Sequence, residues 1–363
     1  MFEIIFLLVV SLYFLLTFYL LTGIKKQFPQ ANNAELPTAA IIVAARNEEK
    51  NILRCLSSLD AQIYPADKLE IIIVDDNSAD STGEIIDTFT HDKSKFKKII
   101  PGKEQGNLKG KVNALAAGIR EAKADIILLT DADCAAPPSW AFNTALYYSN
   151  DTGIVNGFTT QEVNNSFTGM QAIDFIYLIS VASGMTNHGY PVSCIGNNMS
   201  FRKQAYLEAG GYESLPFSVT EDFALLNAVR ELKKYRILHP INPETLITSI
   251  PCPSLKDLLF QKKRWAVGGI NAPLIGKIIM AEAFLAGFFV LLTPLFFSPV
   301  SLYLAVFKIT IDGFFLIPVH ASLGIKNNLK YFFNFQLYYL LYVITLPLIL
   351  IFSRKVKWKG REY

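Results

Sequence analysis

The chain has 363 residues, of which 51% are hydrophobic and 18% are charged, and its formal net charge is +3. This length accommodates about two folded units, and the apolar excess is larger than a soluble protein usually carries. The small net charge gives no support to a nucleic-acid partner, and we expect none. The uneven distribution of the apolar residues along the chain therefore decides the class of protein.

The chain begins with an apolar stretch, residues 2–22, in which Glu3 is the only charged residue. About 20 such residues span the ~30 Å hydrocarbon layer of a bilayer. The stretch has no basic start, short apolar core or small-residue cleavage site, so it does not resemble a signal peptide. We expect an uncleaved transmembrane helix over residues 1–24. Lys25 and Lys26 follow it, and the positive-inside rule then places the next residues in the cytosol and the N-terminus outside.

Residues 37–250 show short apolar runs that alternate with stretches of helical spacing. This alternation predicts an α/β domain with a mostly parallel sheet and helices on both faces. The predicted strands cover residues 39–45, 69–74 and 126–130, and the predicted helices cover 51–59, 85–89 and 112–122.

Polar clusters follow the predicted strands. In sheets of this kind, ligands bind outside the carboxyl ends of the strands, so we expect these clusters to meet at one edge. The clusters are Arg46-Asn47-Glu48, Asp75-Asp76-Asn77-Ser78 and Asp131-Ala132-Asp133.

Each cluster has two interpretations. Asp131 and Asp133 suit a hard cation such as Mg²⁺ or Mn²⁺ bound together with substrate phosphates, but they could also cap a helix before Pro137. Asp75 and Asp76 suit recognition of a base and ribose. The same segment could instead provide a helix cap through its serine.

Three further segments are equally ambiguous when taken singly. Lys111 could meet phosphate charge or belong to a solvated loop. Thr220-Glu221-Asp222 could be catalytic or could simply begin a helix. Gln261-Lys262-Lys263-Arg264-Trp265, within residues 251–277, could bind substrate or form an interfacial helix before a membrane segment.

The C-terminal region, residues 278–353, is apolar, and we divide it into about three transmembrane helices near 279–297, 299–318 and 331–352. Three crossings from the cytosol would leave the basic tail, residues 354–363, outside, which conflicts with the positive-inside rule. One segment is therefore re-entrant or interfacial, or the tail breaks the rule. The middle segment is the weakest span because it contains Lys308 and Asp312, which can pair on one helix face.

The apolar stretch 167–184 is interrupted by Gln171 and Asp174, so we expect a buried or membrane-facing helix there rather than a span. The cysteines share no metal-ligand spacing and should be free thiols in the cytosol. Cys134 is interpreted as a small core residue rather than a nucleophile.

The motifs VDDNS, KGK, TDAD, GNNMSFRK, TED and QKKRW occur in this order between residues 74 and 265. Together they resemble the inverting glycosyltransferases of family 2, and the resemblance covers roughly residues 37–270. It implies a GT-A fold, which is a mixed sheet with helices on both faces that binds a nucleotide sugar, here joined to transmembrane helices.

The resemblance also implies roles for the residues in these motifs. A nucleotide-sugar donor, most often with uridine, would be bound by Arg46, Asn47, Glu48, Asp75, Asp76, Lys111 and Asp131. Asp133, with Asp131, would hold Mg²⁺ or Mn²⁺. Asp222 would be the general base, with Glu221 beside it and Arg264 stabilising the leaving diphosphate, while Gln261 and Trp265 would bind the acceptor.

Because QKKRW comes directly before a membrane segment, we expect a membrane-associated, lipid-linked acceptor. The tail Trp358-Lys359-Gly360-Arg361 is similar to that of ceramide and carotenoid glucosyltransferases. The alternative is a processive polysaccharide synthase of the cellulose, hyaluronan or poly-N-acetylglucosamine type. Either enzyme would be an integral protein of the plasma membrane that serves the cell envelope, with a cytosolic catalytic domain.

Two other classes fit less well. A binding protein that kept the fold without catalysis would not need every carboxylate of these motifs. A sugar nucleotidyltransferase would have a glycine-rich phosphate loop after the first strand, which this chain lacks.

Overall fold

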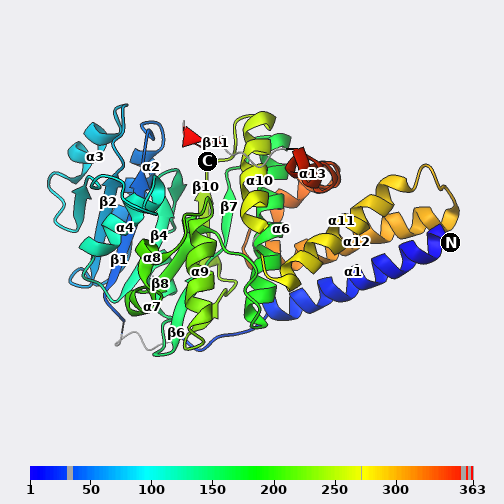
Figure 1. The fold of residues 1–363 in the computed structure, drawn as a ribbon, viewed down its shortest axis with the longest axis horizontal. Helices are drawn as coiled ribbons and strands as arrows, with labels where there is room; N and C mark the ends of the chain where they lie inside the picture. The colour runs from blue at the N-terminus through cyan, green and yellow to red at the C-terminus, as the bar shows by residue number, and fades with distance from the viewer. Residues whose placement is uncertain (31–35, 271, 353–356, 359–360, 363) are drawn as a thin grey trace. The chain divides into compact units, whose positions relative to one another are not determined.

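The computed structural model describes residues 1–30, 36–270, 272–352, 357–358 and 361–362 (Figure 1). These residues separate into two compact units. The sheet unit comprises residues 27–160 and 194–250, and the helical unit comprises residues 1–26, 161–193 and 251–363. The basic tail, residues 354–363, lies mostly outside the described residues.

The sheet unit is built on a mixed sheet with the strand order β3-β2-β1-β4-β8-β6-β9 among the residues described. Strands β1, β2, β3 and β4 are parallel, as predicted, whereas β8 is antiparallel to both β4 and β6. The strands are β1 Ala39–Ala45, β2 Leu69–Asp75, β3 Phe96–Ile99, β4 Ile126–Asp131, β6 Thr152–Asn156, β8 Met199–Arg202 and β9 Arg236–Leu238.

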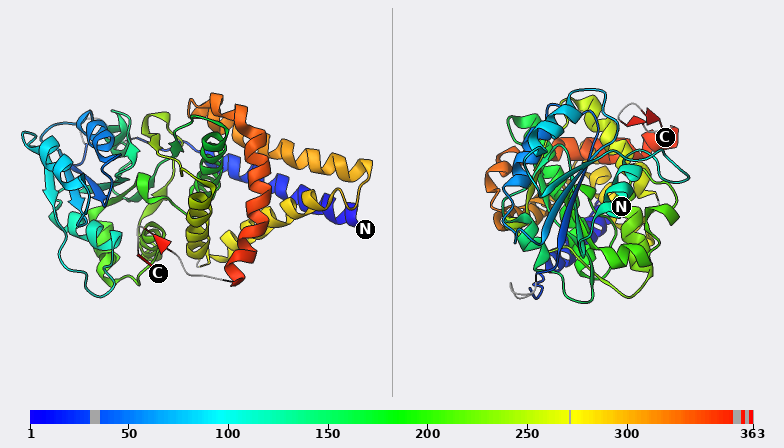
Figure 2. Two further views of the ribbon diagram at one scale, coloured as in Figure 1. Left: turned by 90° about the horizontal axis from the view of Figure 1, so that it is seen from above. Right: turned by 90° about the vertical axis from the view of Figure 1, so that its left-hand side faces the viewer.

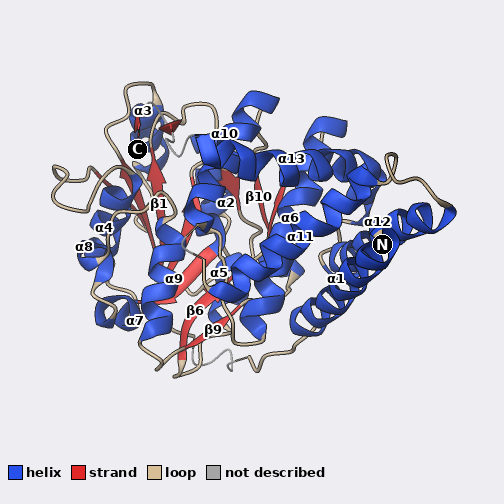
Figure 3. Cartoon of the chain, turned by 45° about the vertical axis from the view of Figure 1, so that its right-hand side comes forward, coloured by secondary structure: helices blue, strands red, loops and turns tan. Residues whose placement is uncertain are grey.

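Helices cover both faces of this sheet (Figure 3). Alternate residues of β1 enter different cores: Ile41 and Val43 pack with α2 and α5 on one face, while Ala40 and Ile42 pack with α4 and α9 on the other. The helices are α2 Ile52–Asp60, α3 Thr82–Thr90, α4 Lys111–Glu121, α5 Trp140–Ala145, α7 Lys203–Glu208, α8 Gly211–Ser214 and α9 Glu221–Glu231. Burial on both faces explains why the parallel strands read as continuous apolar runs.

Shorter elements complete the sheet unit. A second, small sheet has the strand order β5-β10-β7, and its strand β5 directly follows β4 in the chain. Its strands are β5 Cys134–Ala135, β7 Thr159–Gln161 and β10 Ile247–Ser249, and the unit also contains the 3₁₀ helices η2 Gly196–Asn198 and η3 Pro243–Thr245.

The helical unit contains the candidate membrane spans. Within the described part of the chain, four helices are long and apolar enough to cross a membrane, and they cover Phe2–Ile24, Leu274–Leu292, Pro299–Ser322 and Lys326–Ile351. The unit consists of α1 Phe2–Ile24, α6 Ser166–Asn187, α10 Leu255–Gly269, α11 Leu274–Leu292, α12 Pro299–Ser322, η4 Lys326–Tyr331, α13 Phe332–Phe352, β11 Lys357–Trp358 and β12 Arg361–Glu362.

Local sequence signals set several of these helix ends. Asn165 caps α6 in a capping box with Thr168, and Ser298 caps α12 in the same way with Ser301. Pro299 occupies the first position of α12, where its missing N–H costs nothing.

Helices α1 and α6 approach each other closely. A Cβ atom on Gly23 would lie 2.2 Å from the carbonyl oxygen of Gly184, and one on Gly184 would lie 2.7 Å from that of Leu20. The side chain of Asn187 donates to the carbonyl oxygen of Gly23 over 3.1 Å, and Lys26 donates to that of Asn187 over 2.6 Å. Glycine at the crossing and these reciprocal bonds fasten α1 to α6.

Lys308 and Asp312 form a fully buried ion pair, with 2.6 Å between Nζ and Oδ2. Tyr13 of α1 and Gln336 of α13 also donate to the Asp312 carboxylate, over 2.7 and 2.8 Å. This pair weakened the sequence prediction of a membrane span over α12. In the structure its charges are compensated inside the helical unit, where they join α1, α12 and α13.

His239, at the end of β9, gives a testable pH dependence. The ring is fully buried and contacts the carbonyl oxygen of Gly157 through Nε2 over 3.2 Å. Burial lowers the pKa of His239 to about 4. The unfolded chain takes up this proton near the ordinary value of about 6.5, so stability present above pH 6.5 is lost as the pH falls toward 4.

We expect the ring to contribute about 3 kcal/mol of destabilisation by pH 4, at about 1.4 kcal/mol per pKa unit. Thermal unfolding between pH 7.5 and 4.5 should show a smaller loss for His239→Gln than for the unchanged protein. Parallel curves for the two proteins would contradict a neutral buried ring.

Candidate active site

The predicted polar clusters do meet at one edge of the large sheet. Ala45 at the end of β1 is paired with Asp75 at the end of β2, and Ala44 is paired with Asp131 at the end of β4. The loops that leave these strands therefore start side by side. The prediction that these polar clusters would meet at one edge of the sheet is confirmed for the loops after β1, β2 and β4.

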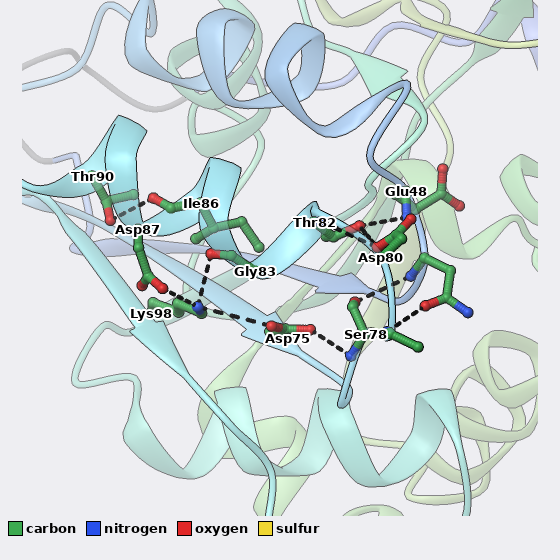
Figure 4. Close-up of polar contacts among 12 residues, drawn as sticks. Glu48, Asp75, Ser78, Asp80, Thr82, Gly83, Ile86, Asp87, Thr90 and Lys98 are labelled. Atoms are coloured by element: carbon green, nitrogen blue, oxygen red, sulfur yellow. Dashed lines mark hydrogen bonds and ion pairs between the residues drawn. The ribbon is translucent and has the colours of Figure 1, made fainter.

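The loops after β1 and β2 fasten to each other (Figure 4). The backbone N–H of Asn47 donates to Ser78 Oγ over 3.1 Å, and Ser78 N–H donates to Asp75 Oδ1 over 3.0 Å. Asn47 and Asn77 have positive φ angles, 53° and 54°, which asparagine tolerates well. Because α3 begins only at Thr82, Ser78 does not cap it, and the capping interpretation of this segment is wrong.

Charged groups line these loops. Arg46 donates to the backbone oxygen of Asp76 over 2.6 Å and lies 3.6 Å from its carboxylate. Asp75 lies 3.8 Å from Lys98 of β3, whose amino group also pairs with Asp87 of α3 (Figure 4). Glu48 uses its backbone N–H to bind Thr82 Oγ1 over 2.7 Å. Both aspartates are buried, and Arg46 beside Asp76 is half-buried.

Lys111, the first residue of α4, connects two of the motifs. Its amino group lies 2.6 Å from Asp131 Oδ1 and 3.1 Å from Glu221 Oε1. Burial opposes the charged form of this lysine, but the carboxylates of Asp131, Glu221 and Asp222 outweigh burial and raise its pKa. Lys111 is therefore a permanent cation between the end of β4 and the start of α9.

Asp133 lies on the turn between β4 and β5. The Cys134 thiol donates to its Oδ1 over 3.3 Å, and Arg54 of α2 donates to its backbone oxygen over 3.1 Å. The same guanidinium also donates to the backbone oxygen of Thr248 in β10, over 3.2 Å. Burial, and then the carboxylates of Asp133 and Asp131, raise the pKa of Cys134, so its thiol is neutral and a poor nucleophile.

Asp222 lies at the start of α9, against the turn η2. A Cβ atom on Gly196 would lie 3.3 Å from Asp222 Oδ2, which shows how closely the carboxylate approaches this turn. Asp222 Oδ1 accepts the N–H of Phe223 over 2.8 Å. Thr220 occupies the cap position of α9, as expected, but makes no side-chain cap bond. The glycine at position 196 permits this close approach, because a Cβ atom there would be in tight contact with the Asp222 side chain.

Gln261, Arg264 and Trp265 belong to α10 of the helical unit. Their spacing places them on one helix face. Neighbouring Lys262 is buried and ion-paired with Asp174 of α6, and its amino group lies 4.6 Å from the Trp265 ring. The Phe175 ring also packs on Trp265, with 5.5 Å between centroids. Lys262, the second residue of QKKRW, thus anchors α10, the helix that also carries Gln261, Arg264 and Trp265.

Sequence reasoning missed Arg54 as a supporting residue. An arginine within a stretch of helical spacing usually belongs to a solvated face, and Thr248, one of its partners, is 194 residues away in the chain. Asn198 was noted only as part of a motif. It accepts from the Trp140 indole over 2.9 Å and donates to the backbone oxygens of Phe158 and Thr245.

The residues that could hold a divalent cation are carboxylates. No group of three or more His, Cys, Asp or Glu side chains in the described residues is arranged to hold a metal ion by itself. Asp131 and Asp133 flank a single residue at the end of β4, and Mg²⁺ or Mn²⁺ commonly takes only one or two carboxylates together with substrate phosphates. The donor set therefore fits a cation that arrives with a diphosphate.

The chain is similar to several known proteins. The sequence matches glycosyl transferase family 2 over residues 40–210 and glycosyl transferase family group 2 over residues 126–353. It is 27% identical over 337 residues to the probable glycosyltransferase YdaM of Bacillus subtilis, covering 87% of this chain and 76% of that protein.

Two further similarities are informative. The poly-beta-1,6-N-acetyl-D-glucosamine synthase of Staphylococcus aureus is 29% identical over 263 residues, which is 71% of this chain but only 61% of the synthase. The fold resembles that of the mannosyltransferase PcManGT from Pyrobaculum calidifontis, solved with GDP-Man and Mn²⁺. The TM-score is 0.61 at 20% identity, covering 96% of this chain and 99% of that one.

The contacts of Lys111 predict a stability effect. Lys111→Met would leave Asp131 and Glu221 facing each other without their shared cation, and these side chains are 33% and 12% exposed. Removing one partner of a buried ion pair costs about 3–5 kcal/mol, and partial exposure reduces this to about 2 kcal/mol.

Thermal unfolding with a chelator present should show this loss for Lys111→Met. Lys109→Met is the matched control, because Lys109 is an exposed lysine two residues earlier, on the loop that enters α4. Equal unfolding temperatures for the two variants would mean that the Lys111 bridge does not hold in solution.

Proposed function

This chain belongs to glycosyl transferase family group 2 and is a glycosyltransferase, and from that premise we propose that it transfers a sugar with inversion from a UDP-sugar to a membrane-associated, lipid-linked acceptor. The observation that carries the proposal is the contact of Lys111 with both Asp131 and Glu221. It brings the donor motif and the proposed catalytic motif to one point of one sheet edge.

The donor occupies the loops after β1 and β2. Asp75 and Asp76 accept hydrogen bonds from the base and ribose at the bottom of the loops, and the Arg46-Asn47-Glu48 segment covers them. Lys111 and Asp131 contact the remainder of the nucleotide sugar. The charge of Lys111 suits phosphate oxygens, because its pKa is raised and the amino group remains protonated.

Asp133, with Asp131, would hold Mg²⁺ or Mn²⁺. When bound, such a cation neutralises negative charge on the departing diphosphate. The bond from Arg54 to the backbone of Asp133 and the bond from the Cys134 thiol fix the carboxylate in place. The first contact positions the backbone of Asp133 and the second contacts its carboxylate directly.

Asp222 is the general base. Its carboxylate accepts the proton of the acceptor hydroxyl while that oxygen attacks the anomeric carbon, and the bond from this carbon to the diphosphate breaks with its electron pair. Glu221 holds Lys111 beside this reaction. Arg264 stabilises the negative charge on the leaving diphosphate, and Gln261 and Trp265 bind the acceptor.

The acceptor is proposed to be at the membrane because of the order of segments in the helical unit. Helix α10, which carries Gln261, Arg264 and Trp265, ends at Gly269, and the apolar helix α11 begins at Leu274. A substrate bound by α10 would therefore lie near the end of a membrane span. The catalytic domain is proposed to be cytosolic and the protein to reside in the plasma membrane.

A processive polysaccharide synthase is the second candidate, and the likeness to the poly-beta-1,6-N-acetyl-D-glucosamine synthase supports it. Incubation of the purified protein with labelled donor and no added lipid distinguishes single transfer from processive synthesis. Single transfer predicts no polymer under these conditions. Long labelled polymer would contradict single transfer and favour the synthase.

Asp222→Asn tests the base directly. The amide keeps the shape of the carboxylate but cannot accept the proton, so we expect kcat to fall by about 10²–10⁴-fold with little change in the donor KM. Glu231→Gln, a neutralised carboxylate at the exposed end of the same helix, is the control and should keep full activity. Equal rates for the two variants would remove Asp222 from the chemistry.

A further inference from the structure

The helices of the helical unit do not all run in the same direction. Helices α1, α11 and α12 lie alongside one another, and contacts join α1 to α11, α1 to α12 and α11 to α12. Helix α13 lies across them. It is seen end-on in Figure 1, and it runs across α1 and α12 in the left view of Figure 2. Helix α13 is long and apolar enough to span a membrane, but it runs in a different direction from α1, α11 and α12.

The buried face of α13 packs on α6 and α10. Tyr342 donates to Asp174 Oδ1 of α6 over 2.8 Å, and Tyr339 donates to the Tyr177 hydroxyl of the same helix over 3.2 Å. Lys262 of α10 pairs with the same Asp174 and lies 5.1 Å from the Tyr342 ring. These buried polar bonds fix α13 against two helices.

Both of these partner helices start close to the catalytic sheets along the chain. β7 ends at Gln161 and α6 begins at Ser166, while β10 ends at Ser249 and α10 begins at Leu255. Such connections reach at most about 20 Å, at roughly 3.5 Å per residue, which is too short to cross a ~30 Å hydrocarbon layer. α6 and α10 therefore begin on the same side of a membrane as the sheet unit, and α13 packs against both of them.

The opposite face of α13 is apolar and uncovered. Phe333, Leu337, Leu341, Leu348 and Ile351 are 52–76% exposed and recur at helical spacing. A soluble surface rarely leaves such a stripe open, whereas lipid acyl chains would cover it.

The charges on both sides of α13 agree with this placement. Lys326 and Lys330 precede the helix, and the sequence after it continues with Arg354, Lys355 and Lys357. A spanning helix would place one of these basic groups outside, against the positive-inside rule. If α13 does not cross, both groups lie on the side of Lys25 and Lys26.

We propose that α13 is a surface helix, lying in the interface of the bilayer on the side of the sheet unit with its apolar stripe against lipid. The inference rests on the membrane attachment in the proposed function. The chain then crosses the membrane through α1, α11 and α12, and both ends of α13 are on the same side as the sheet unit. The segment that does not cross is the last one, not the α12 segment whose Lys308 and Asp312 weakened the sequence signal.

Protection from protease tests on which side of the membrane the C-terminal end of the chain lies. An epitope tag is placed after Tyr363 of the full chain, and sealed inverted membrane vesicles are treated with protease. We expect the tag and the sheet unit to be digested together. A tag that survives while the sheet unit is digested would overturn the surface helix. Release of the unproteolysed protein by alkaline carbonate would instead overturn the membrane attachment on which the inference rests.

Depth measurements test the direction of α13 independently. Single cysteines at Phe333, Leu341 and Leu348 carry a fluorophore, in a background with Cys194→Ser and Cys252→Ser, and are quenched by lipids brominated at defined depths. We expect equal quenching depth along α13. The matched series at Val300, Phe307 and Phe314 of α12, which are also exposed and are spaced seven residues apart compared with eight and seven in α13, should show a gradient of depth. A similar gradient along α13 would overturn the proposal.

Discussion

The contact of one lysine with two carboxylates organises the catalytic edge. Lys111 begins α4, Asp131 ends β4 and Glu221 begins α9, and the amino group lies within 3.1 Å of both carboxylates. The amino group thus joins the end of β4 to the start of α9, and the carboxylates of Asp131, Glu221 and Asp222 raise its pKa against the effect of burial. The same charge serves the proposed donor site, since an amino group that stays protonated next to carboxylates is suited to meet the phosphates of a nucleotide sugar. Structure and proposed chemistry therefore depend on one residue.

The packing of the helical unit depends on buried ion pairs of a similar kind. Asp174 and Asp312 are buried carboxylates, and each is satisfied by a lysine together with side chains from other helices. Buried charges are costly unless they are paired and hydrogen-bonded, so these groups restrict how the helices can pack. Asp174 connects α6, α10 and α13, and Asp312 connects α1, α12 and α13. The helix with the QKKRW motif is held through the first of these centres, which links the proposed acceptor site to the surface helix α13.

Much of the catalytic edge could be predicted from the sequence because its strands are buried on both faces. The predicted strand at residues 39–45 matches β1, and those at 69–74 and 126–130 end one residue short of β2 and β4. The antiparallel β8 and the short β6 and β9 were not predicted, since they show no clear periodicity. The partners of Lys111 and Arg54 could not be predicted either, because they depend on contacts between residues up to 194 apart. Hydropathy also could not show that α13 lies across the other long helices, because its apolar composition is that of a membrane span.

The central claim is that the edge formed by Asp131, Asp133 and Lys111 binds a nucleotide sugar together with a divalent cation. Thermal unfolding of the purified full chain with UDP- or GDP-sugars, each with and without Mn²⁺ or Mg²⁺, tests it most directly when it is repeated on Asp133→Ala. The account predicts that a UDP-sugar raises the unfolding temperature of the unchanged protein only when the cation is present, and that Asp133→Ala loses this increase. Equal protection of both proteins, or protection that needs no cation, would contradict it.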